Sequence, residues 1–227
     1  MIPFGTWLAT SNHVSKIFTR KEFTMAYLWI NPVTDSMYEA EILNDFLLRH
    51  GYQRFHSSTN WLEVVKEKYK ETVQSSSYTV MDMRCPKTTK LLEELGLMSE
   101  VTFPEIHPIL IHCGQECSER EDLAGEEKII TTPCQALADM GNALGLKNTC
   151  FIPWNRFLER LGSEPPGIAP KKSPIPLGFF KELGVNCISL SGEEAIRRFF
   201  EEDRLKGIQL VEMLYCKDGC HNGDGIK

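Results

Sequence analysis

Short apolar runs alternate with longer amphipathic segments along most of the chain. The run at 26–32 ends in Asn-Pro, and the segment after it places apolar residues at Ile42, Phe46 and Leu47. Short apolar runs predict buried strands, whereas apolar residues three to four positions apart predict amphipathic helices. Further strands are predicted at 77–86, 107–114, 128–134, 148–154, 185–191 and 208–216. Helices are predicted at 35–51, 61–73, 87–96, 135–145, 155–162 and 192–207.

This alternation predicts an α/β fold of two facing βαβ lobes, with short, mostly parallel sheets flanked by helices. The stretches "MRCPKTTKLLEELG" and "TPCQALADMGNALG" are locally similar, which indicates two related halves. We therefore predict a single domain at 25–227 with lobes at roughly 25–115 and 125–227. Residues 1–24 match no clear element and are interpreted as an N-terminal extension.

Composition and charge exclude several classes of protein. Of the 227 residues 42% are hydrophobic, which is ordinary for a folded domain, and the net charge of -6 comes without any basic block. A nucleic acid is therefore not expected as the main partner. No apolar run approaches the roughly 18 residues that span a membrane, so no membrane association is expected. The first residues lack a secretory pattern, and we expect a cytoplasmic protein with reduced thiols.

Cysteines mark the carboxyl ends of predicted strands, where open α/β sheets bind ligands. Those at such ends are Cys85, Cys113, Cys134 and Cys216. Two of them, Cys85 and Cys134, also begin helices, whose N-terminal dipole favours a thiolate. Cys220 follows Cys216 in a C-x3-C pair within a glycine-rich tail. This spacing is compatible with an iron–sulfur cluster, with zinc, or with no metal.

Three ordered motifs resemble the catalytic domain of the iron-only (FeFe) hydrogenases. "RCPK" at 84–87, "TPCQA" at 132–136 and "CKDGCHNGDG" at 216–225 are similar to that family's Cys-Cys-Pro, Pro-Cys and Cys-x3-Cys motifs. The resemblance extends over roughly 25–225. It implies a 4Fe–4S cluster at the junction of the lobes. The ligands that it implies are Cys85, Cys134, Cys216 and Cys220.

Two departures from the family pattern imply that hydrogen turnover is absent. Arg84 occupies the position of the family's proton-relaying cysteine, and Leu137 that of a lysine that contacts a diiron ligand. The sequence has no second cluster motif, so a ferredoxin-like protein or a small molecule would have to supply electrons. We therefore expect a hydrogenase-like protein of electron transfer or redox sensing.

Two other classes of function stay open. An enzyme could bind a small substrate in the vacated diiron cavity, lined by Arg84, Gln135 and the Cys113/Cys117 pair. The third class is a zinc-stabilised or metal-free structural module. Whether the chain is an enzyme is not decided by the sequence.

Residues near the implied ligands have two interpretations each. Arg84, Gln135 and Lys217 are candidate cofactor-binding residues, although Arg84 and Lys217 could equally be solvated side chains. An arginine beside the cluster would favour its reduced form. The remaining interpretations concern cysteines and histidines further along the chain. Cys150 and Cys187 are interpreted as core residues, and Cys113 and Cys117 as a redox, substrate-facing or merely reduced pair. His112 and His221 are interpreted as exposed side chains, with a position facing the cluster as the alternative, and Asp224 has no assigned role.

Overall fold

The computed structural model describes residues 25–97 and 101–226 of the chain, so the predicted N-terminal extension lies outside the described residues. Its strands form two four-stranded parallel sheets, one of order β2-β1-β5-β6 and the other of order β4-β3-β8-β7. Their bounds are β1 Ala26–Trp29, β2 Tyr52–Arg54, β3 Thr79–Met81, β4 Val101–Thr102, β5 Lys128–Thr132, β6 Thr149–Pro153, β7 Cys187–Ser191 and β8 Leu210–Leu214. The predicted α/β class, with short parallel sheets, is confirmed.

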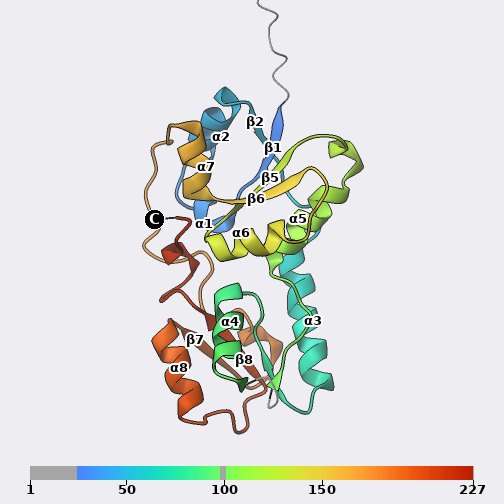
Figure 1. Ribbon diagram of the computed structural model, residues 1–227, viewed down its shortest axis with the longest axis vertical. Helices are drawn as coiled ribbons and strands as arrows, with labels where there is room; N and C mark the ends of the chain where they lie inside the picture. The colour runs from blue at the N-terminus through green and yellow to red at the C-terminus, as the bar shows by residue number, and fades with distance from the viewer. Residues whose placement is uncertain (1–24, 98–100, 227) are drawn as a thin grey trace, which may run out of the picture.

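Helices flank both sheets, and Figure 1 shows the two sheets in opposite halves of an elongated molecule. Their bounds are α1 Pro32–Asp35, α2 Ala40–Arg49, α3 Trp61–Ser75, α4 Pro86–Glu94, α5 Ile109–Glu119, α6 Gln135–Asn142, α7 Trp154–Leu161 and α8 Glu193–Glu201. No helix of the described ranges is both long and apolar enough to cross a membrane.

The predicted lobe ranges do not correspond to the two sheets. Each sheet combines strands from 25–115 with strands from 125–227, because the chain passes between the halves more than once. It leaves the first sheet after β2, runs through α3 to β3, and returns to β5 (Figure 1). After α7 it crosses again, through the proline-rich segment 163–177, to β7. The two halves therefore assemble from interleaved segments.

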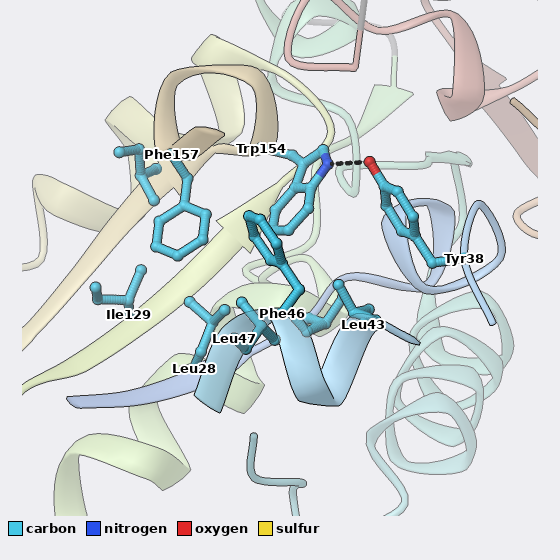
Figure 2. Packing of buried hydrophobic residues seen from close by; sticks show 10 residues of the cluster. Leu28, Tyr38, Leu43, Phe46, Leu47, Ile129, Trp154 and Phe157 are labelled. Carbon is cyan, nitrogen blue, oxygen red and sulfur yellow. Dashed lines mark hydrogen bonds between the residues drawn. The ribbon is translucent and has the colours of Figure 1, made fainter. Parts of the chain in front are cut away.

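The first sheet packs its helices around an aromatic core. In Figure 2, Phe46 and Leu47 of α2 approach Leu28 of β1, and Trp154 and Phe157 of α7 close the cluster. Burying each such side chain contributes about 1.5–3 kcal/mol. The indole Nε1 of Trp154 donates a hydrogen bond of 3.0 Å to the Tyr38 hydroxyl, so its polar edge is also satisfied.

The strand predicted at 107–114 is wrong, because this segment lies in α5. Its buried residues Leu110, Cys113, Gly114 and Cys117 have the i, i+3, i+4, i+7 spacing of one helix face. Gly114 permits this packing, since a Cβ there would lie 2.3 Å from Cζ of Phe151 in β6. The short run "ILI" alone could not distinguish a strand from a helix.

Glu116 of α5 anchors the loop that leads into α3. Its carboxylate accepts hydrogen bonds from the Ser58 N–H (2.6 Å), the Ser58 hydroxyl (2.8 Å), the Thr59 N–H (3.3 Å) and the Trp61 indole (2.6 Å). Burial raises the pKa of Glu116, but these four donors lower it more, to below its usual range. The carboxylate therefore holds the start of α3 against α5 in its ionised form.

We predict that Glu116→Gln lowers the free energy of unfolding by about 1–3 kcal/mol at neutral pH, because an amide group would face donors. In the native chain this contribution is present above the unfolded pKa of about 4.3 and is lost as the pH falls through the lower folded pKa. Urea unfolding at several pH values should therefore show a weaker acid dependence for Glu116→Gln. The exposed Glu119→Gln on the same helix is the control. An acid dependence equal to that of the control and the native chain would contradict this role.

Candidate cysteine centre

Three strand ends deliver cysteines to the junction of the two sheets. Cys85 follows β3, Cys134 follows β5 and Cys216 follows β8, and Cys220 lies in the tail beyond. β3 and β8 are neighbours in one sheet, whereas β5 belongs to the other. Here Cys85, Cys134, Cys216 and Cys220 are called the four-cysteine centre. The positions predicted for Cys85, Cys134 and Cys216 after strands are confirmed, whereas Cys113 lies within α5.

Two members of the centre occupy helix N-caps. Cys85 precedes α4 with Pro86 at the first helical position, where a missing N–H costs nothing. Cys134 is the N-cap of α6, which begins at Gln135. The amino-terminal ends of both helices therefore adjoin the centre, and their dipoles favour negative charge there.

The four thiols act on one another electrostatically. Burial raises the pKa of Cys220 well above its usual range, and the other three thiols of the centre raise it further. The pKa of Cys134 is raised to about 11, by burial first and then by Cys85, Asp224 and Cys216. None of the four forms a disulfide. Cys134 and Cys220 therefore lie in a poorly solvated space and feel the charge of the other thiols of the centre.

The chemistry of the donor set decides which metal group it fits. In the part of the chain that the structure describes, no three His, Cys, Asp or Glu side chains are spaced to hold one metal ion. A 4Fe–4S cluster is held by four cysteine thiolates, and the four-cysteine centre would supply four. In addition, Nδ1 of His221 is buried without a hydrogen-bond partner, beside Cys220. These residues fit a cluster, which would ionise the thiols and offer acceptors to such a donor.

The C-terminal tail crosses directly over the end of β5. The Gly225 N–H donates to the Pro133 carbonyl at 3.1 Å, and a Cβ at Gly223 would lie 2.1 Å from the same oxygen. At Gly219, φ is +120°, and a Cβ there would lie 2.4 Å from Cβ of Ser173 in the proline-rich segment. Close backbone approach thus explains the tail's glycines.

Asp224 joins the tail to both helix starts, a role that the sequence did not suggest. Its carboxylate pairs with Nζ of Lys87 in α4 at 2.7 Å and accepts from the Gln135 N–H of α6 at 2.8 Å. Burial raises the pKa of Asp224, but the hydrogen bonds from Lys87 and Gln135 lower it overall. The only sequence signal was an acidic residue in a glycine-rich tail after the C-x3-C pair.

Arg84 is neither exposed nor a free cation beside the centre. Its side chain is 8% exposed and pairs with Asp82 at 2.7 Å and with Glu212 at 3.1 Å. The guanidinium also stacks on Phe179 and Phe180, 3.9 and 4.5 Å from the ring centroids. Arg84 lies near enough to Cys220 to lower the pKa of that thiol. The solvated interpretation of Arg84 is therefore wrong.

Gln135 and Lys217 make no side-chain contact that supports cofactor binding. The exposed side-chain amide of Gln135 donates to Asp139 at 2.7 Å. Lys217 is exposed, and its main-chain carbonyl accepts from Asn222. Their roles at a cofactor stay predictions.

The other cysteines and histidines lie elsewhere. Cys113 and Cys117 are buried in the packed face of α5, and burial raises their pKa values to about 11 and about 12. Arg84 is buried among carboxylates and Gln135 is exposed. The residues predicted to line a vacated cavity therefore lie in three different environments. The predicted exposure of His112 is also wrong, since it is 7% exposed.

Both histidines and the two strand cysteines differ in their surroundings. The His112 ring stacks on Trp61 at 4.7 Å, and burial, followed by Lys68 and His107, lowers the pKa of His112 to about 4. Cys150 and Cys187 lie in strands β6 and β7 and pack against hydrophobic clusters, as predicted. His221 is half-buried rather than exposed.

Comparisons with known proteins agree with this geometry. No protein-family model matches the chain, and no curated protein sequence matches it. Among solved structures, the chain is similar to a variant of the FeFe-hydrogenase HydA1 from Chlamydomonas reinhardtii, with a TM-score of 0.59 at 11% sequence identity. The match covers 91% of this chain and 81% of that chain. The protein therefore has a fold like that of an FeFe-hydrogenase catalytic domain.

Proposed function

We propose that the four-cysteine centre binds one 4Fe–4S cluster and that the protein acts in electron transfer or redox sensing. The observation that carries this proposal is the convergence of four unoxidised thiols, three from strand ends and Cys220 from the tail, among which Cys85 and Cys216 raise the pKa of both Cys134 and Cys220. The hydrogenase-like fold supports the same conclusion, because it joins two sheets at a cysteine-lined junction.

Each part of the centre would have a distinct task. The four thiolates would hold the cluster, and the starts of α4 and α6 would stabilise its negative charge through their N–H groups. The tail glycines and the proline-rich segment would cover it, since they pack closely against one another at Gly219. When bound, the cluster would supply a one-electron redox couple.

An external electron donor is part of the proposal. The sequence contains no second cluster motif, so we infer a ferredoxin-like protein or a small-molecule donor. Because the cysteines of the centre need to stay reduced before loading, a reducing compartment such as the cytoplasm suits this function.

The function can be tested by redox cycling of anaerobically reconstituted protein. Dithionite should produce a paramagnetic signal of about one spin per cluster, and an oxygen-free oxidant should remove it without loss of iron. A cluster that cannot be reduced, or that is destroyed in the first cycle, would argue against electron transfer.

We predict that the protein neither consumes nor evolves hydrogen, even when it is produced together with enzymes that build diiron centres. General acid catalysis requires a proton donor in hydrogen-bond reach of the reacting atom. Burial lowers the pKa of Arg84, but Asp82 and Glu212 raise it above its usual range, so Arg84 releases no proton at neutral pH. Leu137 is buried and offers no charge to an anionic diiron unit.

Hydrogen assays and infrared spectra check this prediction. The spectra should lack the bands of metal-bound carbon monoxide and cyanide. Their appearance together with hydrogen evolution would show that Arg84 and Leu137 do not exclude the diiron chemistry.

A further inference from the structure

A buried ion triad lies between the two strands that lead into Cys85 and Cys216. Asp82, Arg84 and Glu212 have side chains that are 0%, 8% and 1% exposed. Burying three charges costs several kcal/mol for each ion before their attraction is counted. A gain in stability alone therefore does not explain the triad. Its position between the two cysteine-bearing strands indicates a second role.

Glu212 is the best-connected member of the triad. Its Oε1 accepts from Nη2 of Arg84 (3.1 Å) and the Phe179 N–H (3.0 Å). Its Oε2 accepts from the Gly178 N–H (2.7 Å) and the Ser189 hydroxyl (2.5 Å). Its two oxygens thus accept from four donors, which is the full acceptor capacity of a carboxylate.

Asp82 completes the triad from the neighbouring strand. Its Oδ1 accepts from the Arg84 N–H (3.0 Å) and Nε (2.9 Å), and its Oδ2 accepts from Nη2 (2.7 Å). The Tyr69 hydroxyl also donates to Oδ1, at 3.4 Å. Two carboxylates thus face one guanidinium, which leaves one net negative charge. The stabilisation of the reduced cluster that an isolated arginine would give is therefore largely offset.

The triad connects directly to the four-cysteine centre through the chain. Arg84 immediately precedes Cys85, whereas Glu212 lies in β8 four residues before Cys216. β3 and β8 are hydrogen-bonded neighbours, with Met81 opposite Val211. The ion pair between Arg84 and Glu212 therefore ties the residue before Cys85 to the strand that leads to Cys216. Phe179, which Glu212 holds by its N–H, closes the group by stacking on the guanidinium.

We propose that Glu212 is a positioning residue of the centre, which through Arg84 sets the separation of Cys85 and Cys216 and places a fixed negative charge beside them. The separation is a property of the chain itself, whereas the effect of the charge rests on the proposed cluster. The two parts have separate tests.

The separation is tested on the metal-free protein. A short bifunctional maleimide should link Cys85 to Cys216, and the linked peptides can be counted by mass spectrometry. We expect the yield to fall several-fold in Glu212→Gln and in Arg84→Lys, which keeps the charge but loses the two-pronged contact with Asp82. Glu194→Gln is the control, because Glu194 is a carboxylate on α8 that is 88% exposed. Thermal unfolding shows which variants are folded. If Glu212→Gln does not fold, the milder change Arg84→Lys carries the test. An unchanged yield in folded Arg84→Lys or Glu212→Gln would overturn the positioning role.

The charge is tested on the reconstituted protein. Removing a negative charge beside a cluster stabilises its reduced form, so Glu212→Gln should have a higher midpoint potential than the native protein and Glu194→Gln. If Glu212→Gln binds much less iron than Glu194→Gln, that loss is the result expected from misplaced cysteines. Equal iron content and equal potentials in the two variants would overturn the proposal. If the native protein binds no cluster, the proposed function fails, and the cross-linking yields still decide the positioning role.

Discussion

Replacing Cys220 by serine will deplete the anaerobically reconstituted protein of iron. Burial raises the pKa of Cys220, and all three other thiols of the centre raise it further, so Cys220 is buried close to each of them. A hydroxyl does not ionise there as a thiol does, and soft sulfur ligands are what iron–sulfur clusters select. Changing a residue that only hydrogen-bonds to a metal ligand lowers metal affinity by at least about 10-fold. Because Cys220 would itself be a ligand, we expect a larger loss of iron affinity. Iron and sulfide content per chain is the measurement.

Matched serine variants separate ligands from core cysteines. Cys85→Ser, Cys134→Ser and Cys216→Ser should lose the cluster in the same way. Cys150→Ser should keep it, because Cys150 lies in β6 and packs against the hydrophobic core of the first sheet. A Cys220→Ser protein with native iron content would remove Cys220 from the ligand set.

Gly223→Ala should prevent the tail from closing over the end of β5. The φ of Gly223 is -71°, which any residue adopts, so the added Cβ acts only by collision. That atom would lie 2.1 Å from the Pro133 carbonyl, which belongs to the backbone next to Cys134 and cannot move independently. We expect a loss of about 3 kcal/mol in the free energy of unfolding. Since Cys220 and Cys134 lie on the two colliding segments, the cluster should be lost as well.

Gly207→Ala is the control for this substitution. Gly207 has a φ of +78° in open surroundings, so alanine there is strained but meets no atom. It should cost about 1–2 kcal/mol and leave the cluster content unchanged. Gly223→Ala protein that keeps both its stability and its cluster would show that the tail does not pack on Pro133 in solution.

The sequence predicts long, periodic elements well and short ones poorly. The helix at 61–73 and the strands leading to Cys134 and Cys216 are found as predicted, because each has several apolar residues in phase. Strands β2 and β4 were not predicted, since three and two residues are too few to show a period. They are recognised only by pairing with β1 and β3. The interleaving of the two sheets likewise depends on pairings between distant segments.

The cysteine positions could be predicted because strand ends and helix starts are local features. The roles of Asp224 and Glu212 could not, because their partners lie up to 137 residues away along the chain. An arginine before Cys-Pro also gives no sign of whether its charge is free or paired. Only the positions of Asp82 and Glu212 show that it is paired.

Iron and acid-labile sulfide, counted per chain after anaerobic reconstitution of the native sequence, test the central claim most directly. The four-cysteine centre predicts about four irons and four sulfides, in a brown protein that contains no stoichiometric zinc. A colourless protein that binds one zinc per chain, or no metal at all, would contradict the assignment of Cys85, Cys134, Cys216 and Cys220 as ligands of a 4Fe–4S cluster.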